Sequence, residues 1–398
     1  MSRILFAFNY YGISPNNSGG GGAVNYSHLK LLSELGHEIV LLPIIWDNKS
    51  KFDKNDFDES KDLIEKVVPL KIYQRQRYRG FNWLFKALFK PTEFEYFFIN
   101  KKNKESIQHI VTNNNIDIVW CEWRWAALLV LKTKLNVLKL YSHHDWEYKL
   151  SLLKNKPTLN NRFHAFQKKR VEIKMVKKFD ACISGSNTEA KEISSISNKK
   201  ALYIPITYSL IPFKEKNNSA IKIVHLGSMG TTANRLGLER FLDVCWNDIK
   251  KQLPQIQLHI IGNTDQAHNS LKEKLKSDSQ IKVIGFVKEL ADVLYPNDIH
   301  IVPWEHNTGT RTRVPLVLNF KQALVATKAS VNCFPEITDK NAILSNNLHE
   351  MTKQIIDLYS DTERLHLLSE NGYKTFLESF TYTAQLNTLN DFLKTIHK

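Results

Sequence analysis

Two arginines one residue apart follow a glycine in the segment 309–313, which reads Gly-Thr-Arg-Thr-Arg and comes directly after an apolar run. A glycine turn at the end of a strand brings backbone N–H groups close to a ligand. Each guanidinium group can pair with two phosphate oxygens and keeps its charge at neutral pH. This combination favours a diphosphate site formed by Gly309, Thr310, Arg311 and Arg313. The alternative is a pair of solvated arginines on a surface loop.

A second glycine turn ends another apolar run. Gly227 and Ser228 form this turn, Asn234 and Arg235 precede the next helical pattern, and Gly262 ends the following strand in the same way. The start of a helix after a strand favours anion binding, because free N–H groups and the helix dipole point at the ligand. We therefore expect these five residues to line the same anion site. The alternative is a tight turn that binds no ligand, which would give the same sequence pattern.

Four successive glycines lie between the strand pattern 3–9 and the helical pattern 25–35. They lack both the GxGxxG spacing of a dinucleotide fold and the Gly-Lys-Ser/Thr of a P-loop, so neither NAD nor P-loop chemistry is indicated. The pattern predicts a flexible loop that borders an acceptor or a phosphate group, or a flexible loop without a ligand. The four residues are Gly19, Gly20, Gly21 and Gly22.

Histidine and carboxylate neighbours follow a third apolar run. His143, His144 and Asp145 stand at the carboxyl end of a predicted strand, where they are placed to orient a substrate hydroxyl or take its proton. We favour His144 over His143 as the inward-facing residue. The alternative is a helix capped by Asp145 with two surface histidines.

Apolar runs alternate with helical patterns along nearly the whole chain, which indicates α/β domains with parallel sheets covered on both faces. The run 206–220 contains Pro212 and a polar stretch and is typical of a linker. The sequence therefore predicts two Rossmann-like doubly wound domains facing a central cleft. They comprise residues 1–205 and 221–380, and a final helix over 381–398 is expected to pack back toward the first domain.

The positive charge of the chain is unevenly distributed. The formal net charge is +15, and residues 1–200 hold 33 of the 55 lysines and arginines but 20 of the 40 acids. Such asymmetry favours contact of the first half with an anionic membrane or a polyanion. The four cysteines are far apart in apolar segments, and no metal-binding spacing occurs, so no disulfide framework and no metal is expected.

Basic and aromatic residues alternate between Lys71 and Phe98. This composition favours docking on an anionic membrane surface, with rings at the level of the headgroups. The alternatives are stacking on nucleic-acid bases and a helix that packs its aromatic face into the core. The residues predicted for the membrane or acceptor surface are Arg75, Arg77, Arg79, Trp83, Lys86 and Lys90.

The order and spacing of several motifs resemble GT-B glycosyltransferases, and most closely the retaining, nucleotide-sugar-dependent family 4 that includes bacterial surface-polysaccharide transferases. The likeness covers nearly the whole chain and is strongest between residues 221 and 327. The motifs are Gly36-His37-Glu38, Gly227-Ser228-Met229 with Asn234, Ile260-Ile261-Gly262, Gly285-Phe286-Val287, and Pro303 followed by Gly309 and Arg313.

The resemblance implies roles for several of these residues. It places Gly227 and Arg313 on the donor diphosphate, His144 near the reacting sugar, and the N-terminal glycines near the acceptor. One position departs from the family, because Leu316 stands where a glutamate usually binds the nucleotide ribose. Glu305 lies near the place of the second usual acid. We expect altered donor recognition with a retained grip on the diphosphate.

These observations predict a cytoplasmic glycosyltransferase, peripheral on the inner face of the plasma membrane. It is expected to move a hexose from a nucleotide-diphosphate sugar to a glycan or lipid-linked glycan in capsule, O-antigen or exopolysaccharide synthesis. The resemblance further implies retention of configuration, and we expect no metal or other cofactor and no nucleic-acid partner. The alternatives are a non-catalytic sugar-nucleotide or glycan-binding partner of an assembly complex, and a GT-B sugar-nucleotide epimerase.

Overall fold

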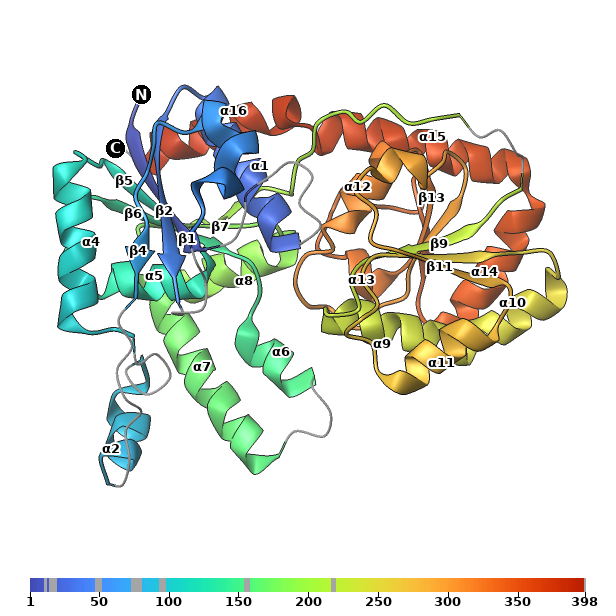
Figure 1. Ribbon diagram of the computed structural model, residues 1–398, viewed down its shortest axis with the longest axis horizontal. Helices are drawn as coiled ribbons and strands as arrows, with labels where there is room; N and C mark the ends of the chain where they lie inside the picture. Colours follow the sequence, from blue (N-terminus) through green and yellow to red (C-terminus); the bar gives the residue numbers. More distant parts are fainter. Residues whose placement is uncertain are drawn as a thin grey trace.

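In the computed structural model the chain forms two α/β domains side by side (Figure 1). The structure describes residues 1–10, 13, 20–46, 52–72, 81–92, 98–153, 158–215 and 220–396, with only the backbone of 81–84. The prediction of two doubly wound domains is confirmed by the two parallel sheets. In this described part of the chain, no helix is both long and apolar enough to cross a bilayer.

The N-terminal sheet has the strand order β3-β2-β1-β5-β6-β7-β8, with β4 also paired to β2, and its pairs are parallel. The chain runs outward from β1 in one direction and then from β5 in the other, so the point between β1 and β5 is where such folds bind ligands. The strands are β1 (Arg3–Asn9), β2 (Glu38–Ile45), β3 (Lys66–Val67), β4 (Leu70–Lys71), β5 (Ile118–Glu122), β6 (Leu138–His143), β7 (Ala181–Ser184) and β8 (Leu202–Tyr203).

The C-terminal sheet has the order β11-β10-β9-β12-β13-β14, again with parallel pairs. Counted along the chain this is the order 3-2-1-4-5-6 of a Rossmann fold, and its switch point lies between β9 and β12. The strands are β9 (Ile223–Leu226), β10 (Leu258–Ile261), β11 (Ile281–Gly285), β12 (Ile299–Val302), β13 (Ala323–Thr327) and β14 (Ile343–Ser345).

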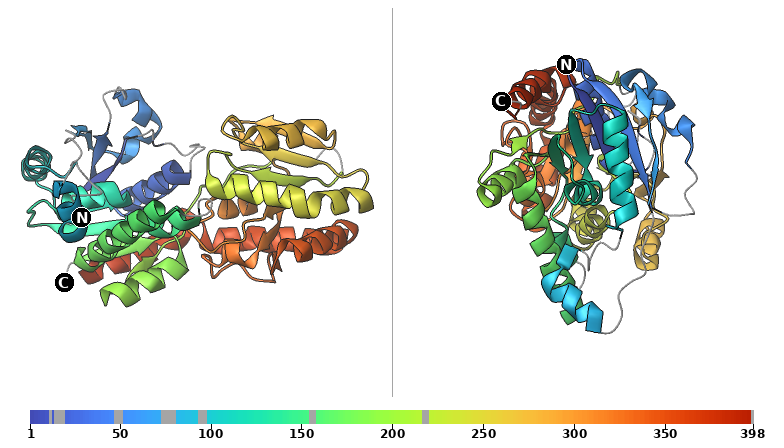
Figure 2. Two further views of the ribbon diagram at one scale, coloured as in Figure 1. Left: turned by 90° about the horizontal axis from the view of Figure 1, so that it is seen from below. Right: turned by 90° about the vertical axis from the view of Figure 1, so that its left-hand side faces the viewer.

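Helices cover both faces of each sheet (Figures 1 and 2). In the first domain they are α1 (Gly20–Glu34), α2 (Phe81–Phe89), α4 (Lys101–Asn113), α5 (Trp123–Leu131), α6 (Glu147–Leu153), α7 (Leu159–Lys178) and α8 (Asn187–Ser197), with the 3₁₀ helix η1 (Lys54–Leu63). In the second they are α9 (Thr232–Phe241), α10 (Asn247–Gln252), α11 (Asn269–Ser277), α12 (Arg313–Asn319), α13 (Lys328–Val331), α14 (Leu348–Ser360) and α15 (Thr362–Ser379), with the π-helical turn η2 (Leu242–Trp246) and the 3₁₀ turn η3 (Leu290–Asp292).

Strand β1 shows why the strands read as continuous apolar runs. Residues Ile4 to Phe8 have no exposed surface, and alternate side chains enter opposite layers. Leu5 and Ala7 pack into one core cluster, whereas Ile4, Phe6 and Phe8 pack into the cluster on the other face. A strand buried on both faces has no solvent side, so polar residues are excluded from it until its carboxyl end.

The last helix returns to the first domain. Helix α15 packs on α12 and β13 of the second domain, and α16 (Tyr382–Ile396) then packs on α1. Tyr382, Leu389 and Phe392 enter the N-terminal core. Figure 2 shows α16 lying against the first domain. The chain therefore crosses between the domains twice, once through the segment after β8 and once before α16.

The prediction of a glycine loop ahead of a helix from Asn25 was wrong for the described glycines. Gly20, Gly21 and Gly22 form the first turn of α1, which begins at Gly20, and Gly19 lies outside the described residues. Glycine has a poor helix propensity, but tertiary packing decides helix ends more strongly than propensity does. The consequence is that the helix N-terminus, with its free N–H groups, lies where a loop was expected.

Candidate functional site

The two domains meet at the carboxyl ends of their sheets. Gly309, in the loop after β12, donates its N–H to Glu189 Oε1 of α8 at 3.4 Å. A Cβ atom on Gly309 would lie 1.7 Å from Asp145 Oδ1, and one on Gly20 would lie 3.0 Å from Thr312 Oγ1. Thr310 is also close to the first domain, because its Oγ1 would lie 3.3 Å from a Cβ on Gly185. The segment 309–313 therefore sits between the domains and touches both.

Arg313 begins helix α12 and is buried below this segment. Its Nη1 donates to the backbone oxygen of Leu226 at 2.6 Å and to Asn234 Oδ1 at 2.7 Å, and lies 3.4 Å from His225 Nε2. These contacts join the end of β9, the start of α9 and the start of α12. The predicted donor residues Asn234 and Arg313 are thus brought together at the switch point between β9 and β12.

Glycine is required next to this arginine. Gly227 has φ +144°, and a Cβ there would lie 2.3 Å from Asn234 Nδ2 and 3.0 Å from Arg313 Nη1. Gly262 has φ +122°, and its Cβ would strike the backbone oxygen of Gly227. The N–H of Gly227 donates to the oxygen of Ile261 at 2.8 Å. Gly227 therefore provides space and backbone shape beside Arg313, whereas its own N–H is used within the sheet.

The charge around Arg313 is unbalanced. Burial, together with the charge of Arg311, lowers the pKa of Arg313 to about 9, so the guanidinium group is still protonated at neutral pH. His225 and His300 lie nearby, and burial followed by the charge of Arg313 lowers the pKa of both imidazoles, which are therefore neutral. In the described part of the chain, no carboxylate lies within 4.0 Å of either arginine head group.

Arg311 lies closer to the interface than Arg313. Its Nη2 donates to the backbone oxygen of Thr308, and its guanidinium carbon lies 6.0 Å from the ring centre of Trp304. A Cβ on Gly309 would be 3.2 Å from Arg311 Nη2 and closer still to Asp145. The two arginines thus present two positive charges at one end of the interface, one buried and one half-buried.

A buried carboxylate lies across the interface at the end of β5. Glu122 has no exposed surface and accepts hydrogen bonds from His28 Nδ1 at 2.7 Å, Trp120 Nε1 at 2.6 Å and His144 Nε2 at 2.5 Å. Burial raises the pKa of Glu122, but the attraction of His28 and the hydrogen bonds from both histidines outweigh burial and hold that pKa well below its usual range. Trp123 stacks on the His144 ring with centroids 4.2 Å apart.

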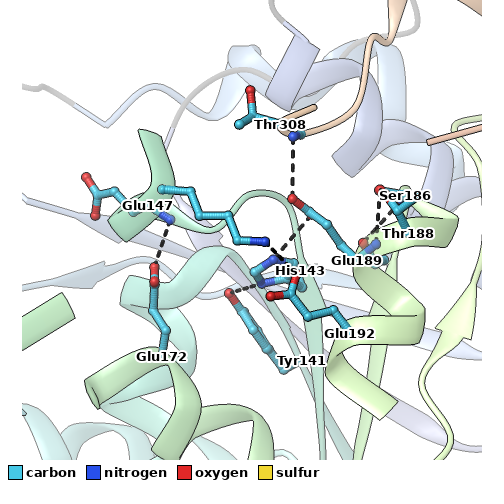
Figure 3. A network of polar contacts seen from close by, with 12 residues as sticks. Tyr141, His143, Glu147, Glu172, Ser186, Thr188, Glu189, Glu192 and Thr308 are labelled. Carbon is cyan, nitrogen blue, oxygen red and sulfur yellow. Dashed lines mark hydrogen bonds and ion pairs between the residues drawn. The ribbon is translucent and has the colours of Figure 1, made fainter. Parts of the chain in front are cut away.

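Asp145 shares its surroundings with a second carboxylate, Glu189. Figure 3 shows Glu189 between His143, whose Nε2 lies 3.3 Å from Glu189 Oε2, and the loop that contains Thr308. Burial and the charge of Glu189 raise the pKa of Asp145 to about 7, against the opposing effect of Arg311. Two close carboxylates cannot both ionise without cost. Asp145 is therefore partly protonated near neutral pH, and it faces the cationic 309–313 loop together with Glu189.

The raised pKa predicts a pH dependence of stability. A carboxyl whose pKa is higher in the folded than in the unfolded protein stabilises the fold below pH 4, and this contribution is lost as the pH rises through about 7. Asp145→Asn resembles the protonated acid at every pH. We expect this variant to raise Tm at pH 8 and to change it little at pH 4, measured by differential scanning fluorimetry. An equal change of Tm at both pH values would contradict the raised pKa.

Glu172 of α7 fixes the segment that follows Asp145. It accepts from the N–H group of Glu147 at 3.0 Å (Figure 3) and from that of Tyr148 at 3.3 Å, and these are the first two residues of α6. Burial raises the pKa of Glu172 to about 7. These bonds tie α6 to α7 and so hold the end of the His144-Asp145 segment in place.

The remaining predicted donor residues lie around the arginine cluster in supporting positions. Ser228 Oγ accepts from the N–H of Gly230 at 3.2 Å, and Arg235 Nη1 donates to the oxygen of Met229 at 3.2 Å. Glu305 is paired with Arg240 Nε of α9 at 3.4 Å. Leu316 is half-buried against the apolar core of the second domain, which is consistent with a position that carries no ribose-binding acid.

The residues predicted for the membrane or acceptor surface lie partly outside the described part of the chain. Arg75, Arg77 and Arg79 lie outside the described residues, as does the side chain of Trp83. Lys86 lies on α2 and Lys90 directly after it.

In the described part of the chain, no group of three or more His, Cys, Asp or Glu side chains is arranged to hold a metal ion.

Sequence reasoning missed Glu122, His28 and Glu189. Glu122 ends a strand that is otherwise apolar, and a charged residue at that point of a buried strand was the available signal. His28 stands inside a helix and Glu189 near the start of another, where nothing in the spacing sets them apart. Their partners lie 94 and 120 residues away in the chain, so only the fold brings them to the site.

Comparison with known proteins agrees with this architecture. The sequence profile of the family "Glycosyl transferases group 1" matches residues 220–361, which is the C-terminal domain up to α14. This range contains the glycine turns and both arginines of the cluster. No curated protein sequence matches the chain.

Solved structures resemble the chain over its full length at low sequence identity. Sucrose-phosphate synthase from Thermosynechococcus elongatus has a TM-score of 0.73 at 13% identity and covers 100% of this chain and 99% of its own. TarM of S. aureus has a TM-score of 0.73 at 10% identity, with the same coverage. HepE of Anabaena, in complex with UDP-glucose, has a TM-score of 0.69 at 11% identity and covers 99% of this chain and 100% of its own.

These likenesses confirm the resemblance to GT-B glycosyltransferases that was inferred from the sequence. The structural matches extend over both domains, whereas the family match is confined to the second. The first domain, with Glu122 and His144, lies outside the residues that the family profile matches. The chain has the GT-B fold of these glycosyltransferases, and its C-terminal domain matches the family "Glycosyl transferases group 1".

Proposed function

We propose that the protein transfers a hexose from a nucleoside-diphosphate sugar to a glycan or lipid-linked glycan acceptor in bacterial cell-surface polysaccharide synthesis. The observation that carries this proposal is Arg313. It is a buried cation, 8% exposed, with no carboxylate within ion-pair distance among the described residues. Burying a charge without a partner is costly, so such a site favours an anionic ligand. Arg311 adds a second positive charge, and two cations suit a diphosphate.

In this proposal the two arginines stabilise the negative charge that develops on the departing nucleoside diphosphate. Fixed positive groups in a site that excludes water are effective in this role, because they need no rearrangement as the charge develops. Gly227 leaves room for the Asn234 side chain and the Arg313 guanidinium group at the proposed diphosphate site. Asp145 and His144 of the first domain stand across the interface, where the sugar and the acceptor hydroxyl would lie. HepE, a fold relative, is seen in complex with UDP-glucose, which supports this class of donor.

A screen of nucleotide sugars by thermal shift tests the donor class. A ligand that binds only the folded chain raises Tm, by an amount that grows with its concentration relative to Kd. We expect a nucleoside diphosphate and its cognate sugar conjugate to raise Tm in buffer with EDTA, in line with metal-independent binding. Failure of every nucleotide to shift Tm, with or without Mg²⁺, would overturn the proposal. Conversion of the donor to an epimer without acceptor would instead indicate an epimerase, and product stereochemistry tests the proposed retention.

Altered ribose recognition belongs to the same proposal. With Leu316 packed toward the core, this position offers no carboxylate to the ribose hydroxyls. Discrimination between ribose and 2′-deoxyribose nucleotides is therefore expected to be weak. Comparing the thermal shifts of the two nucleoside diphosphates measures this directly.

The proposed membrane location rests on α2, α6 and α7, which project together from the N-terminal domain (Figure 1) and are called the α2–α7 protrusion below. Arg170 of α7 donates to the oxygen of Leu88 at 3.1 Å, so α2 and α7 are joined. The protrusion carries six of the thirteen exposed large apolar side chains among the described residues. They are Phe85, Leu88, Phe89, Leu152, Leu159 and Phe166.

Cationic residues accompany these apolar side chains. Arg162 and Lys169 of α7 line a shallow groove with Leu152 and Phe166. Exposed rings and aliphatic chains beside lysines and arginines suit the interface of an anionic bilayer, where apolar groups insert and cations meet phosphate headgroups. We therefore propose peripheral attachment to the inner face of the plasma membrane through the α2–α7 protrusion.

Liposome sedimentation tests this attachment. Leu159, which is 85% exposed, and Phe166, which is 57% exposed, can be replaced by glutamate without filling or emptying the core. The double variant is expected to lose most of its binding to anionic vesicles. Leu367→Glu, at a 59% exposed leucine of α15, is the matched control and should bind as the wild type does. Equal binding of all three proteins, or salt-sensitive binding to nucleic acid in place of vesicles, would contradict the proposal.

A further inference from the structure

Glu122 holds three N–H donors from three elements on one buried carboxylate. Its Oε1 accepts from His28 of α1 and Trp120 of β5, and its Oε2 accepts from His144 at the end of β6. The side chain of Glu122 has no exposure and that of His144 has 7%. Such complete enclosure means that the carboxylate meets no substrate directly. Its influence on the site must pass through the groups that it binds.

The hydrogen bond to Glu122 determines the tautomer of His144. Burial lowers the pKa of the His144 ring, outweighing the opposite effect of Glu122, so the ring is neutral at neutral pH. A neutral imidazole carries one N–H, and the ionised Glu122 requires it on Nε2, since a carboxylate can only accept. Nδ1 of His144 is then an unprotonated acceptor. A carboxylate that fixes the tautomer of a histidine therefore also decides which kind of group the other ring nitrogen can bind.

The plane of the ring is fixed separately. Trp123 stacks on His144 with an interplanar angle of 19° and has φ +69°. A bulky residue in the left-handed region is strained and persists only where the surrounding structure holds it there. Here the strained residue lies directly between β5 and α5 and brings the indole ring over the histidine. Two contacts, one along the ring edge and one across its face, thus restrain His144.

The position of this pair matches the reacting part of the proposed site. Glu122 ends β5, at the switch point beside β1, and His144 is followed by Asp145, which faces Gly309 and Arg311. A sugar whose diphosphate lies on Arg311 and Arg313 would therefore extend toward His144.

We propose that Glu122 is a positioning residue that keeps His144 as the Nε2–H tautomer, so that Nδ1 accepts a hydrogen bond from a hydroxyl group of the bound sugar or acceptor. The inference rests on the proposed function and deepens it. It means that Glu122, which does not touch the substrate, determines which ring nitrogen of His144 can accept a hydrogen bond.

Glu122→Gln tests the proposal. His28 and Trp120 both donate to Oε1 of Glu122, so the carbonyl oxygen of glutamine is expected at that position. The NH₂ group of glutamine then faces His144 Nε2. Nε2 must then accept, and the proton moves to Nδ1, which can no longer accept from a hydroxyl. We expect kcat of transfer, or of donor hydrolysis if no acceptor is known, to fall about 10- to 100-fold, with little change in the KM for the donor.

A pH profile separates this role from a merely structural one. The titratable groups that act on His144 are Glu122, His28 and His143. Because Glu122 favours protonation of the ring, its removal should move the acid limb of kcat to lower pH while the plateau falls. Trp120→Phe removes a donor from the same carboxylate without touching His144, and its acid limb should stay in place. An unchanged acid limb in Glu122→Gln would overturn the proposal.

A double-mutant cycle completes the test. In a His144→Ala background, Glu122→Gln should lower kcat little further, since the residue it positions is gone. Full additivity of the two losses would overturn the proposal. If Glu122→Gln does not fold, Glu122→Asp is the variant to use. It keeps the negative charge on a side chain that is one methylene shorter, and it is expected to lower the plateau of kcat without moving the acid limb. Wild-type protein that processes no nucleotide sugar would disprove the proposed function, whereas an active wild type with an equally active Glu122→Gln disproves only this inference.

Discussion

Arg313→Ala is expected to lower kcat/KM of transfer by at least about 10²- to 10³-fold, the scale on which removal of one preorganised donor acts on a developing negative charge. Nη1 of Arg313 is held by Leu226 O and Asn234 Oδ1, so the guanidinium group is already oriented before a ligand binds. The variant should also lose the thermal shift caused by a nucleoside diphosphate. Steady-state kinetics and fluorimetry on the same preparations measure both effects.

Two matched variants sharpen this experiment. Arg313→Lys keeps the charge but cannot form both hydrogen bonds with the same geometry, so an intermediate activity is expected. Arg240→Ala removes an exposed arginine that pairs with Glu305 on the same domain, and it should leave the thermal shift intact. Near-normal turnover of a folded Arg313→Ala protein would refute the role of this residue in binding the diphosphate.

Gly309→Ala is expected to lower transfer by about 10²-fold or more, because a displacement of about 1 Å at a reacting pair has effects of this size. Gly309 has φ +62°, and the new methyl group would lie 1.7 Å from Asp145 Oδ1, which belongs to the other domain. The clash is relieved only by moving the Asp145 carboxylate or by moving the 309–313 segment away from the first domain, and either movement disturbs the proposed site. Nucleotide binding to the second domain should weaken less than transfer, since the contacts of Arg313 lie within that domain.

Gly36→Ala is the matched control for this variant. Gly36 has φ +79°, so alanine there pays a similar backbone penalty, yet no atom lies within 4 Å of the added Cβ. Both variants are expected to lose about 1–2 kcal/mol of stability from the left-handed backbone. Only Gly309→Ala should lose transfer. Equal activities in the two variants would show that close contact between Gly309 and Asp145 is not needed for catalysis.

The fold could be predicted well because its signals are local. Strands such as β1 and β12 are buried on both faces and therefore stand out as apolar runs in the sequence. The N-terminal glycines were assigned to a loop on propensity, and the start of α1 at Gly20 depends on tertiary contacts that propensity does not contain.

The site was predictable where its residues are neighbours in the chain. Arg311 and Arg313 follow a strand and a glycine turn, which is a local pattern, and the structure places both at the switch point of the second sheet. The carboxylate network was not predictable, since Glu122 meets His28 and His144 only after β1, β5 and β6 have paired. Nor does the sequence show that Gly227 serves by leaving space rather than by donating its N–H.

A crystal structure of the protein with a bound nucleoside diphosphate tests the central claim most directly. We expect phosphate oxygens within hydrogen-bond distance of the guanidinium groups of Arg311 and Arg313, beside Gly227. The end of the diphosphate that would carry the sugar is expected to face His144. A nucleotide bound away from both arginines, or a diphosphate held by Arg235 or Arg240 while Arg313 keeps only its present contacts, would contradict it.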